Sequence, residues 1–134
     1  MENSRISTAD EFHKSGMNCA QAVVCTYCDM FNIDKETVFK MAEGFGAGMG
    51  SMQYVCGALS GLIMLLGLKN SSGLPEKSTK ADTYKIAKEL TEKFKNKTGS
   101  VFCHELKGLN GNSPLRSCKD CIEDACKIFE EYIE

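Results

Sequence analysis

The sequence has no marked excess of charge of either sign and no hydrophobic run long enough to cross a membrane. Its 16 basic and 18 acidic residues leave a formal net charge of -2, which argues against a nucleic-acid or anionic-membrane partner. The most apolar stretch, YVCGALSGLIMLLGL, is bounded by Gln53 and Lys69 and falls short of the roughly 20 residues that a bilayer span needs. We therefore expect no membrane insertion and interpret this stretch as a buried helix.

The first residues, MENSRISTADEF, lack the apolar core of a secretory signal peptide. This absence predicts a cytoplasmic location, where thiols are kept reduced. Eight cysteines are many for a chain of 134 residues in such a compartment. A framework of structural disulfides is then unexpected, and metal binding or thiol redox chemistry with a redox partner protein becomes the leading interpretation.

Alternating strand patterns are also missing, and helix signals dominate. Side chains that cap helix starts precede apolar residues at helical spacing, and glycines follow them. These signals predict helices that start near Thr8, Asn18, Asp34, Ser78, Ser100 and Ser117, and an apolar helix that contains Cys56. The expected fold class is an all-α, single-domain helical bundle of about five to seven helices over residues 1–134.

Several details of these helices are specific enough to be tested. Thr8 and Glu11 have the spacing of a capping box, and the helix after Asn18 is expected to reach about Phe31. The helix from about Ser78 to Lys97 is expected to place Tyr84, Ala87, Leu90 and Phe94 on its inner face. Gly57 and Gly61 lie one turn apart, which leaves a groove for a neighbouring helix.

Four glycines alternate with other residues in GFGAGMG, residues 44 to 50, and CGALSG follows shortly after. A dinucleotide site needs G-x-G-x-x-G after a strand, and a phosphate loop ends in G-K-[ST]. Here Met49 and Ser51 occupy the positions at which a third glycine would be needed, and no lysine follows. The run therefore matches neither nucleotide-binding motif. Because glycine lets the backbone approach other groups closely, the run is predicted to present Cys56 to other cysteines and to border their centre. A plain connection between helices is the alternative.

Three cysteines are expected at helix N-termini: Cys19, Cys103 and Cys118. The free N–H groups and the helix dipole at such positions favour the thiolate, which is the nucleophile of disulfide exchange and a ligand of soft metals. His104, next to Cys103, and His13 are candidate ligands or acid–base groups, although two histidines without a common pattern are more often surface residues.

The remaining cysteines, apart from Cys56, lie in different sequence surroundings. Cys25 and Cys28 form C-x-x-C inside an apolar helix, and Cys126 belongs to the inner side of the last helix, so these three are predicted to be packing residues. Cys121 remains open: it forms C-x-x-C with Cys118 at a helix start, but no βαβ pattern supports a thioredoxin-like fold.

The motifs NCAQAV, GFGAGMG with CGALSG, CHELKG and SCKDCIEDACKIFEEYI occur in this order over most of the chain. In this the chain resembles the redox-active protein family named for its C-GCAxxG-C-C signature. The resemblance implies a small cytoplasmic redox or metal-binding role, with Cys19, Cys56, Cys103 and Cys118 as the four signature thiols. Typical members carry apolar residues where this chain has Cys121 and Cys126, and the remaining two cysteines are also additional.

Three functions follow from the four signature thiols as hypotheses. The leading one is an iron–sulfur cluster held by Cys19, Cys56, Cys103 and Cys118 for electron transfer, since such clusters use four cysteines. The second is an enzyme, a metal-free thiol/disulfide oxidoreductase in which the same residues are catalytic. The third is a structural zinc site that binds the same four thiolates and stabilises the bundle.

Overall fold

A computed structural model of the protein describes residues 3–109, 111 and 113–134. The described residues form seven α-helices: α1 (Ile6–Lys14), α2 (Cys19–Tyr27), α3 (Lys35–Ala42), α4 (Gly57–Asn70), α5 (Lys80–Thr98), α6 (Cys103–Leu106) and α7 (Cys118–Ile133). Short helical turns lie at Cys28–Phe31, Glu43–Phe45, Gly48–Met52 and Pro75–Lys77. Within these ranges there is no strand, only one isolated antiparallel bridge between Val55 and Phe102, so the predicted all-α class is confirmed.

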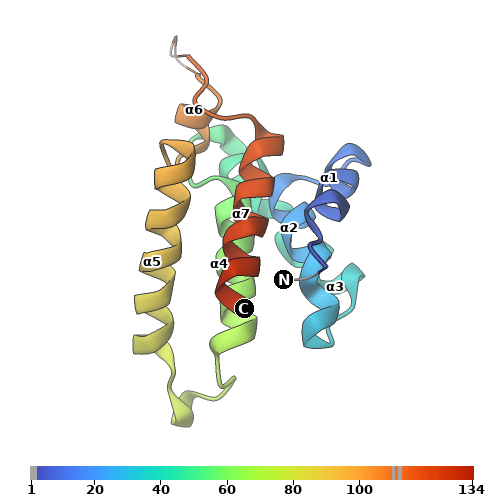
Figure 1. Ribbon diagram of the computed structural model, residues 1–134, viewed down its shortest axis with the longest axis vertical. Helices are drawn as coiled ribbons and strands as arrows, with labels where there is room; N and C mark the ends of the chain where they lie inside the picture. The colour runs from blue at the N-terminus through green and yellow to red at the C-terminus, as the bar shows by residue number, and fades with distance from the viewer. Residues whose placement is uncertain (1–2, 110, 112) are drawn as a thin grey trace.

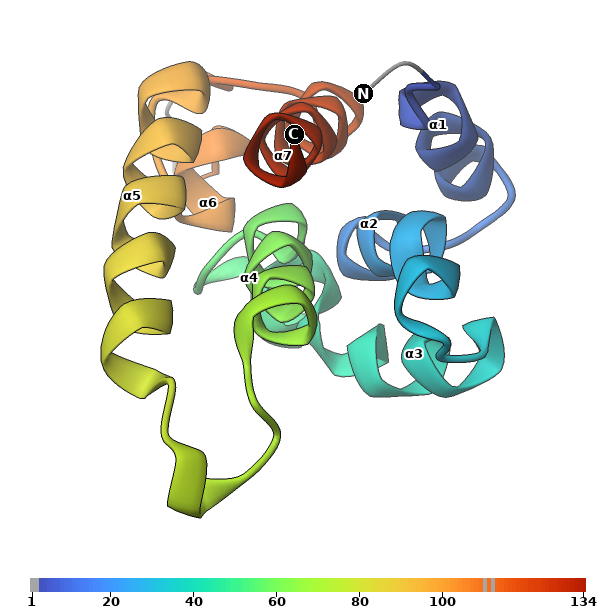
Figure 2. The same cartoon turned by 60° about the horizontal axis from the view of Figure 1, so that its bottom comes forward.

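Helix α4 lies in the middle of the bundle and packs against α2, α7 and α5 (Figures 1 and 2). Helices α1 and α3 flank α2, and the short α6 lies at the end of the bundle where α4 and α7 begin (Figure 1). The largest side chains of the core are fully buried between these helices: Tyr27, Phe94, Phe129, Leu62, Leu65, Leu66, Ile122 and Ile128. None of the helices in the described ranges combines the length and the apolar character of a bilayer span.

The close approach of α2 to α4 depends on glycine. A Cβ atom at Gly61 would lie 3.0 Å from Cβ of Val23 and 3.1 Å from the carbonyl oxygen of Ala20. Both of these α2 residues are fully buried. The predicted groove along α4 therefore exists, and α2 fills it.

Three of the predicted helix caps are confirmed. In each, a side-chain oxygen accepts the backbone N–H three residues on, which satisfies a donor that the helix leaves unpaired. The pairs are Asn18 with Gln21 at 2.8 Å, Asp34 with Thr37 at 2.9 Å and Ser117 with Asp120 at 3.0 Å. These caps fix the first turns of α2, α3 and α7.

The predicted start of α1 is wrong, because the helix begins two residues before Thr8 and Arg5 is its N-cap. No side chain caps this start. Instead, the Arg5 backbone N–H donates to the buried carboxylate of Glu130 at 2.9 Å, and the Arg5 guanidinium donates to the Thr26 carbonyl at 3.0 Å. Contacts with α2 and α7, which no local pattern encodes, therefore set where α1 begins.

Three further expectations need correction. The helix from Cys19 ends at Tyr27, and residues 28 to 31 continue as a tighter 3₁₀ turn. Tyr84 on α5 is 67 % exposed rather than packed inward, while Leu90 and Phe94 are buried as predicted. The N-cap of α6 is Phe102, not Ser100; the Ser100 hydroxyl accepts the Phe102 backbone N–H at 3.0 Å.

Candidate functional site

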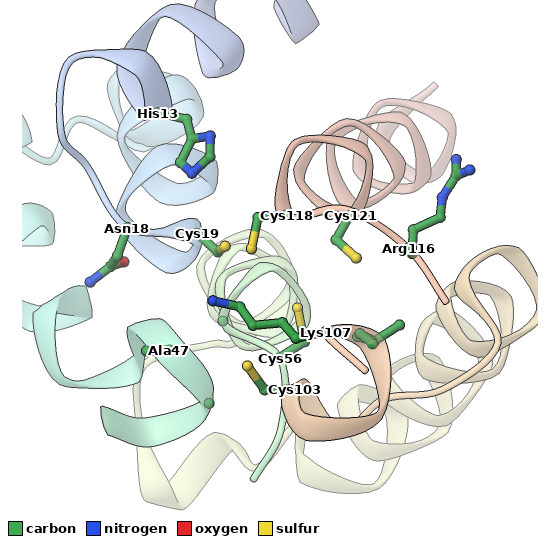
Figure 3. A pocket seen from close by; sticks show the side chains of 13 residues that line it. His13, Asn18, Cys19, Ala47, Cys56, Cys103, Lys107, Arg116, Cys118 and Cys121 are labelled. Carbon is green, nitrogen blue, oxygen red and sulfur yellow. The ribbon is translucent and has the colours of Figure 1, made fainter. Parts of the chain in front are cut away.

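Five cysteines line one cavity of about 150 Å³ at the end of the bundle where α2, α4, α6 and α7 begin (Figure 3). Four are the candidates from the sequence, and the fifth was left open: Cys19, Cys56, Cys103, Cys118 and Cys121. All eight cysteines of the chain are free thiols in the structure. Residues that lie far apart in the sequence thus form one thiol centre.

Helix starts bring these thiols together. Cys19 and Cys118 are the first residues of α2 and α7, and Cys103 is the first residue of α6. Cys56 is the N-cap of α4, one residue before the helix in which it was expected. The N-terminal N–H groups of these helices therefore surround the centre, and their partial positive charge favours thiolates.

A two-stranded contact connects the segments that carry Cys56 and Cys103. The Cys56 backbone N–H donates to the Val101 carbonyl at 2.8 Å, and the Cys103 N–H donates to the Tyr54 carbonyl at 2.8 Å. These are the hydrogen bonds around the isolated bridge of Val55 with Phe102. They fix two cysteines that the sequence separates widely at adjacent positions in the cavity wall.

The glycine run forms part of that wall through Ala47 and Gly48. The four residues from Ala47 to Gly50 all have positive φ, with values of 51°, 57°, 64° and 84°. This left-handed turn brings Gly48 against α6, where a Cβ atom would lie only 2.5 Å from Cβ of Cys103. The run thus borders the thiol centre, and glycine at position 48 is required for Cys103 to lie where it does.

Cys19 and Cys118 form the outer pair of the centre. Both are partly exposed, and the Cys19 thiol donates a hydrogen bond to the Cys118 sulfur. This bond lowers the pKa of Cys118 to about 5, with a further contribution from the Lys107 ammonium. The same bond, together with burial, raises the pKa of Cys19. Cys118 is therefore the thiolate and Cys19 its protonated partner.

Cys56 and Cys121 form the inner pair. They are only 6 % and 1 % exposed, so both are more deeply buried than the outer pair. The Cys121 thiol donates to Cys56 and lowers its pKa, and the N–H groups of Ala58 and Leu59 at the start of α4 act in the same direction against burial. The pKa of Cys121 is raised by the same bond and by burial. In each pair one cysteine is thus made more acidic by its partner: Cys118 in the outer pair and Cys56 in the inner pair.

Lys107 is the cation that lies closest to the outer thiolate, to which it donates a hydrogen bond. Burial acts to lower its pKa, but the negative charge of Cys118 and the neighbouring sulfurs outweighs this and raises it. Arg116 also lines the cavity, but its guanidinium is engaged by Asp124 at 2.9 and 3.1 Å. His104 does not line the cavity; its ring lies beside that of Phe102.

Sequence reasoning missed Lys107 and assigned no role to Cys121. Helical spacing was the available signal for both residues. Lys107 follows Cys103 by four positions and Cys121 follows Cys118 by three, so each lies on the same helix face as a candidate thiol. The contacts of Lys107 and Cys121 with the other cysteines depend on how the neighbouring helices pack, so the spacing alone does not reveal them.

The other three cysteines lie outside this cavity. Burial raises the pKa of Cys25 to about 11 and that of Cys126 to about 12, and it also raises that of Cys28. Cys126 is fully buried in the core, and Cys25 and Cys28 border a separate hollow between α1 and α3. Their surroundings agree with a packing role.

We expect Cys25→Ala and Cys126→Ala each to lower the free energy of unfolding by about 1–2 kcal/mol, because each removes one buried sulfur atom. Urea denaturation followed by circular dichroism measures this change. The thiol redox titration of both variants should match that of the wild-type protein. A changed titration in Cys25→Ala would show that the division of the cysteines into centre and packing residues is wrong.

No group of three or more cysteine, histidine or carboxylate side chains in the described part of the chain has an arrangement ready to hold a metal ion. Four of the five sulfurs at the cavity instead interact in two pairs, Cys19 with Cys118 and Cys56 with Cys121. A thiol that donates to a thiolate must first lose its proton before it binds a metal.

A family model described as "Putative redox-active protein (C_GCAxxG_C_C)" matches residues 17–132. The chain therefore belongs to this family of cysteine-rich redox-active proteins. The matched range contains all five residues of the thiol centre and α2 through most of α7. Comparison with curated proteins and with solved structures found no match.

Proposed function

We propose that the protein is a thiol–disulfide oxidoreductase in which the outer pair exchanges electrons with the substrate. The observation that carries this proposal is that Cys19 and Cys118 line the same cavity at partly exposed positions, where Cys19 and Lys107 lower the pKa of Cys118. A nucleophilic thiolate with a second thiol in contact is the arrangement that disulfide exchange requires.

The exchange proceeds in two balanced steps. The Cys118 thiolate attacks one sulfur of a substrate disulfide, whose S–S bond breaks and releases one substrate thiolate. The Cys19 thiol then gives its proton to that thiolate, and the Cys19 sulfur attacks Cys118. The second substrate thiolate leaves, so the substrate gains two electrons and the protein holds a Cys19–Cys118 disulfide.

The inner pair serves as an internal electron donor to that disulfide. Cys56 in its thiolate form attacks Cys118 and releases the Cys19 thiolate. Cys121 gives its proton to that thiolate and attacks Cys56, which breaks the Cys56–Cys118 bond. This forms a Cys56–Cys121 disulfide and restores the Cys118 thiolate. Burial of the inner pair limits its direct contact with substrate, so a redox partner protein re-reduces the centre through the outer pair. Such a cycle is compatible with the reducing conditions of the cytoplasm.

Oxidation with one equivalent of a small disulfide should produce a single Cys19–Cys118 or Cys56–Cys121 cross-link, and two equivalents should produce both. Peptide mapping by mass spectrometry under non-reducing conditions identifies the bonds. Cys25 and Cys28 serve as the internal control and should remain free thiols. A first disulfide that joins Cys103 to either pair would contradict the assignment.

An iron–sulfur cluster for electron transfer is the second candidate, and the observation that favours it is that all four signature cysteines line one cavity. Cys103, which belongs to neither pair, would then complete the ligand set with Cys19, Cys56 and Cys118. Anaerobic purification followed by iron, sulfide and zinc analysis separates the candidates. Stoichiometric iron and sulfide that disappear in Cys56→Ser would favour the cluster, zinc alone the structural site, and a metal-free active protein the oxidoreductase.

A further inference from the structure

Apart from the cysteines, the ionisable side chains that line the cavity are all basic. Among its described lining residues are a lysine, an arginine and a histidine but no carboxylate: Lys107, Arg116 and His13. Asp124 pairs with Arg116 through two hydrogen bonds, whereas Lys107 pairs only with the Cys118 sulfur itself, so Lys107 is the cation that can act on a ligand at the outer pair. This one-sided lining is not explained by the overall composition, which has slightly more acidic than basic residues.

Lys107 lines the cavity beside the outer pair. Its side chain extends across the cavity between Cys103 and the outer pair, and it is only partly buried (Figure 3). The Lys107 backbone N–H donates to the Cys103 carbonyl at 2.9 Å, which fixes the base of the side chain to α6. An incoming disulfide that reaches Cys118 therefore passes close to the ammonium group.

We propose that the thiol centre is selective for small disulfides that carry negative charge close to the S–S bond, with Lys107 as the residue that determines this selectivity. The inference rests on the proposed oxidoreductase function and adds the substrate class to it. A cavity of about 150 Å³ is smaller than a typical ligand pocket of about 300–1,000 Å³, so only a short arm of the substrate enters it.

The ammonium of Lys107 acts twice on such a substrate. Its charge attracts a carboxylate on the substrate arm and so orients the adjacent sulfur toward Cys118. When the substrate S–S bond breaks, the leaving sulfur gains a negative charge beside the same ammonium, which stabilises it. A disulfide with ammonium arms meets repulsion from Lys107 at both stages, and the lining offers it no carboxylate in exchange.

Three disulfides of similar size and different charge test this proposal: 3,3'-dithiodipropionate, bis(2-hydroxyethyl) disulfide and cystamine. The second-order rate constant of protein oxidation is measured for each by loss of free thiol. We expect the ratio of the anionic to the neutral rate constant to be about tenfold higher in the wild-type protein than in Lys107→Met. Lys107→Arg, which keeps the charge, should retain most of this ratio.

Lys127→Met is the matched control, because it removes the same charge from an exposed position on α7 outside the cavity. It should keep the wild-type ratio. The wild-type protein gives a second readout that needs no variant: added salt should slow the anionic disulfide and speed the cationic one.

The outcomes distinguish a failure of the charge selectivity from a failure of the oxidoreductase function. An equal anionic-to-neutral ratio in the wild-type protein and Lys107→Met, with rapid reaction of the neutral disulfide, overturns the charge selectivity and supports the oxidoreductase function. A wild-type protein that reduces none of the three disulfides overturns the oxidoreductase function and, with it, the selectivity. A ratio that falls equally in Lys127→Met also overturns the role of Lys107.

Discussion

Replacement of Cys118 by serine should lower the reaction rate of the protein with a neutral disulfide at pH 6 by at least about tenfold. With a pKa of about 5, Cys118 is about nine-tenths thiolate at this pH, whereas an ordinary cysteine is below about 1 % thiolate. A thiolate of low pKa is less nucleophilic, which offsets part of this advantage but not all of it. Stopped-flow measurement of thiol consumption gives the rate directly.

The pH dependence identifies the responsible group. In the wild-type protein the rate should rise with pH to half its plateau near pH 5 and then change little to neutrality, because Cys118 is already deprotonated. Cys19→Ala removes the main hydrogen bond to that thiolate, so its half-maximum should move to higher pH. Cys28→Ser changes a thiol outside the cavity and should leave the profile unchanged. A wild-type midpoint near pH 8 would contradict the assignment of Cys118.

Gly48→Ala should lower the free energy of unfolding by about 3 kcal/mol. The added methyl group meets Cβ of Cys103 at 2.5 Å, and alanine at a φ of 57° is itself unfavourable. Because Cys103 starts α6, the clash should also displace this helix and disturb the reactivity of the outer pair. Thermal and urea denaturation measure the loss of stability, and the pH profile of thiol reactivity measures the disturbance.

Gly50→Ala is the matched comparison for this effect. Gly50 also has positive φ, at 84°, but nothing lies within 4 Å of a Cβ atom built there. It should therefore show only the conformational cost of about 1 kcal/mol, with unchanged thiol reactivity. Equal losses at the two positions would mean that the turn, and not the contact with Cys103, determines the need for glycine.

The parts of the fold that local interactions determine were predictable from the sequence. Asn18, Asp34 and Ser117 satisfy donors three residues away, so the starts of α2, α3 and α7 follow from short motifs. The start of α1 did not follow, because it depends on contacts of Arg5 with distant Glu130 and Thr26. Tyr84 fits the helical period of α5, but the neighbouring helices do not reach it.

The candidate site was likewise predictable only where local sequence determines it. The positions of Cys19 and Cys118 at helix starts followed from the caps Asn18 and Ser117, whereas the predicted cap Ser100 before Cys103 was wrong. The structure places all three cysteines in one cavity. The pairing of the thiols did not follow, because it depends on how α2, α4 and α7 are rotated against one another. The left-handed conformation of Ala47 and Met49 was equally hidden, since these residue types rarely adopt positive φ.

The joining of α2 and α7 at the outer pair has a consequence for synthesis of the protein. Cys19, Cys56 and Cys103 are made before Cys118, which lies on the last helix of the chain. A growing chain therefore carries three members of the centre without Cys118, and the partners of Cys19 and Cys56 reach them only when α7 docks against α2 and α4. The outer pair is complete only when α7 lies against α2, so a chain in which α7 has not docked lacks the contact of Cys19 with Cys118.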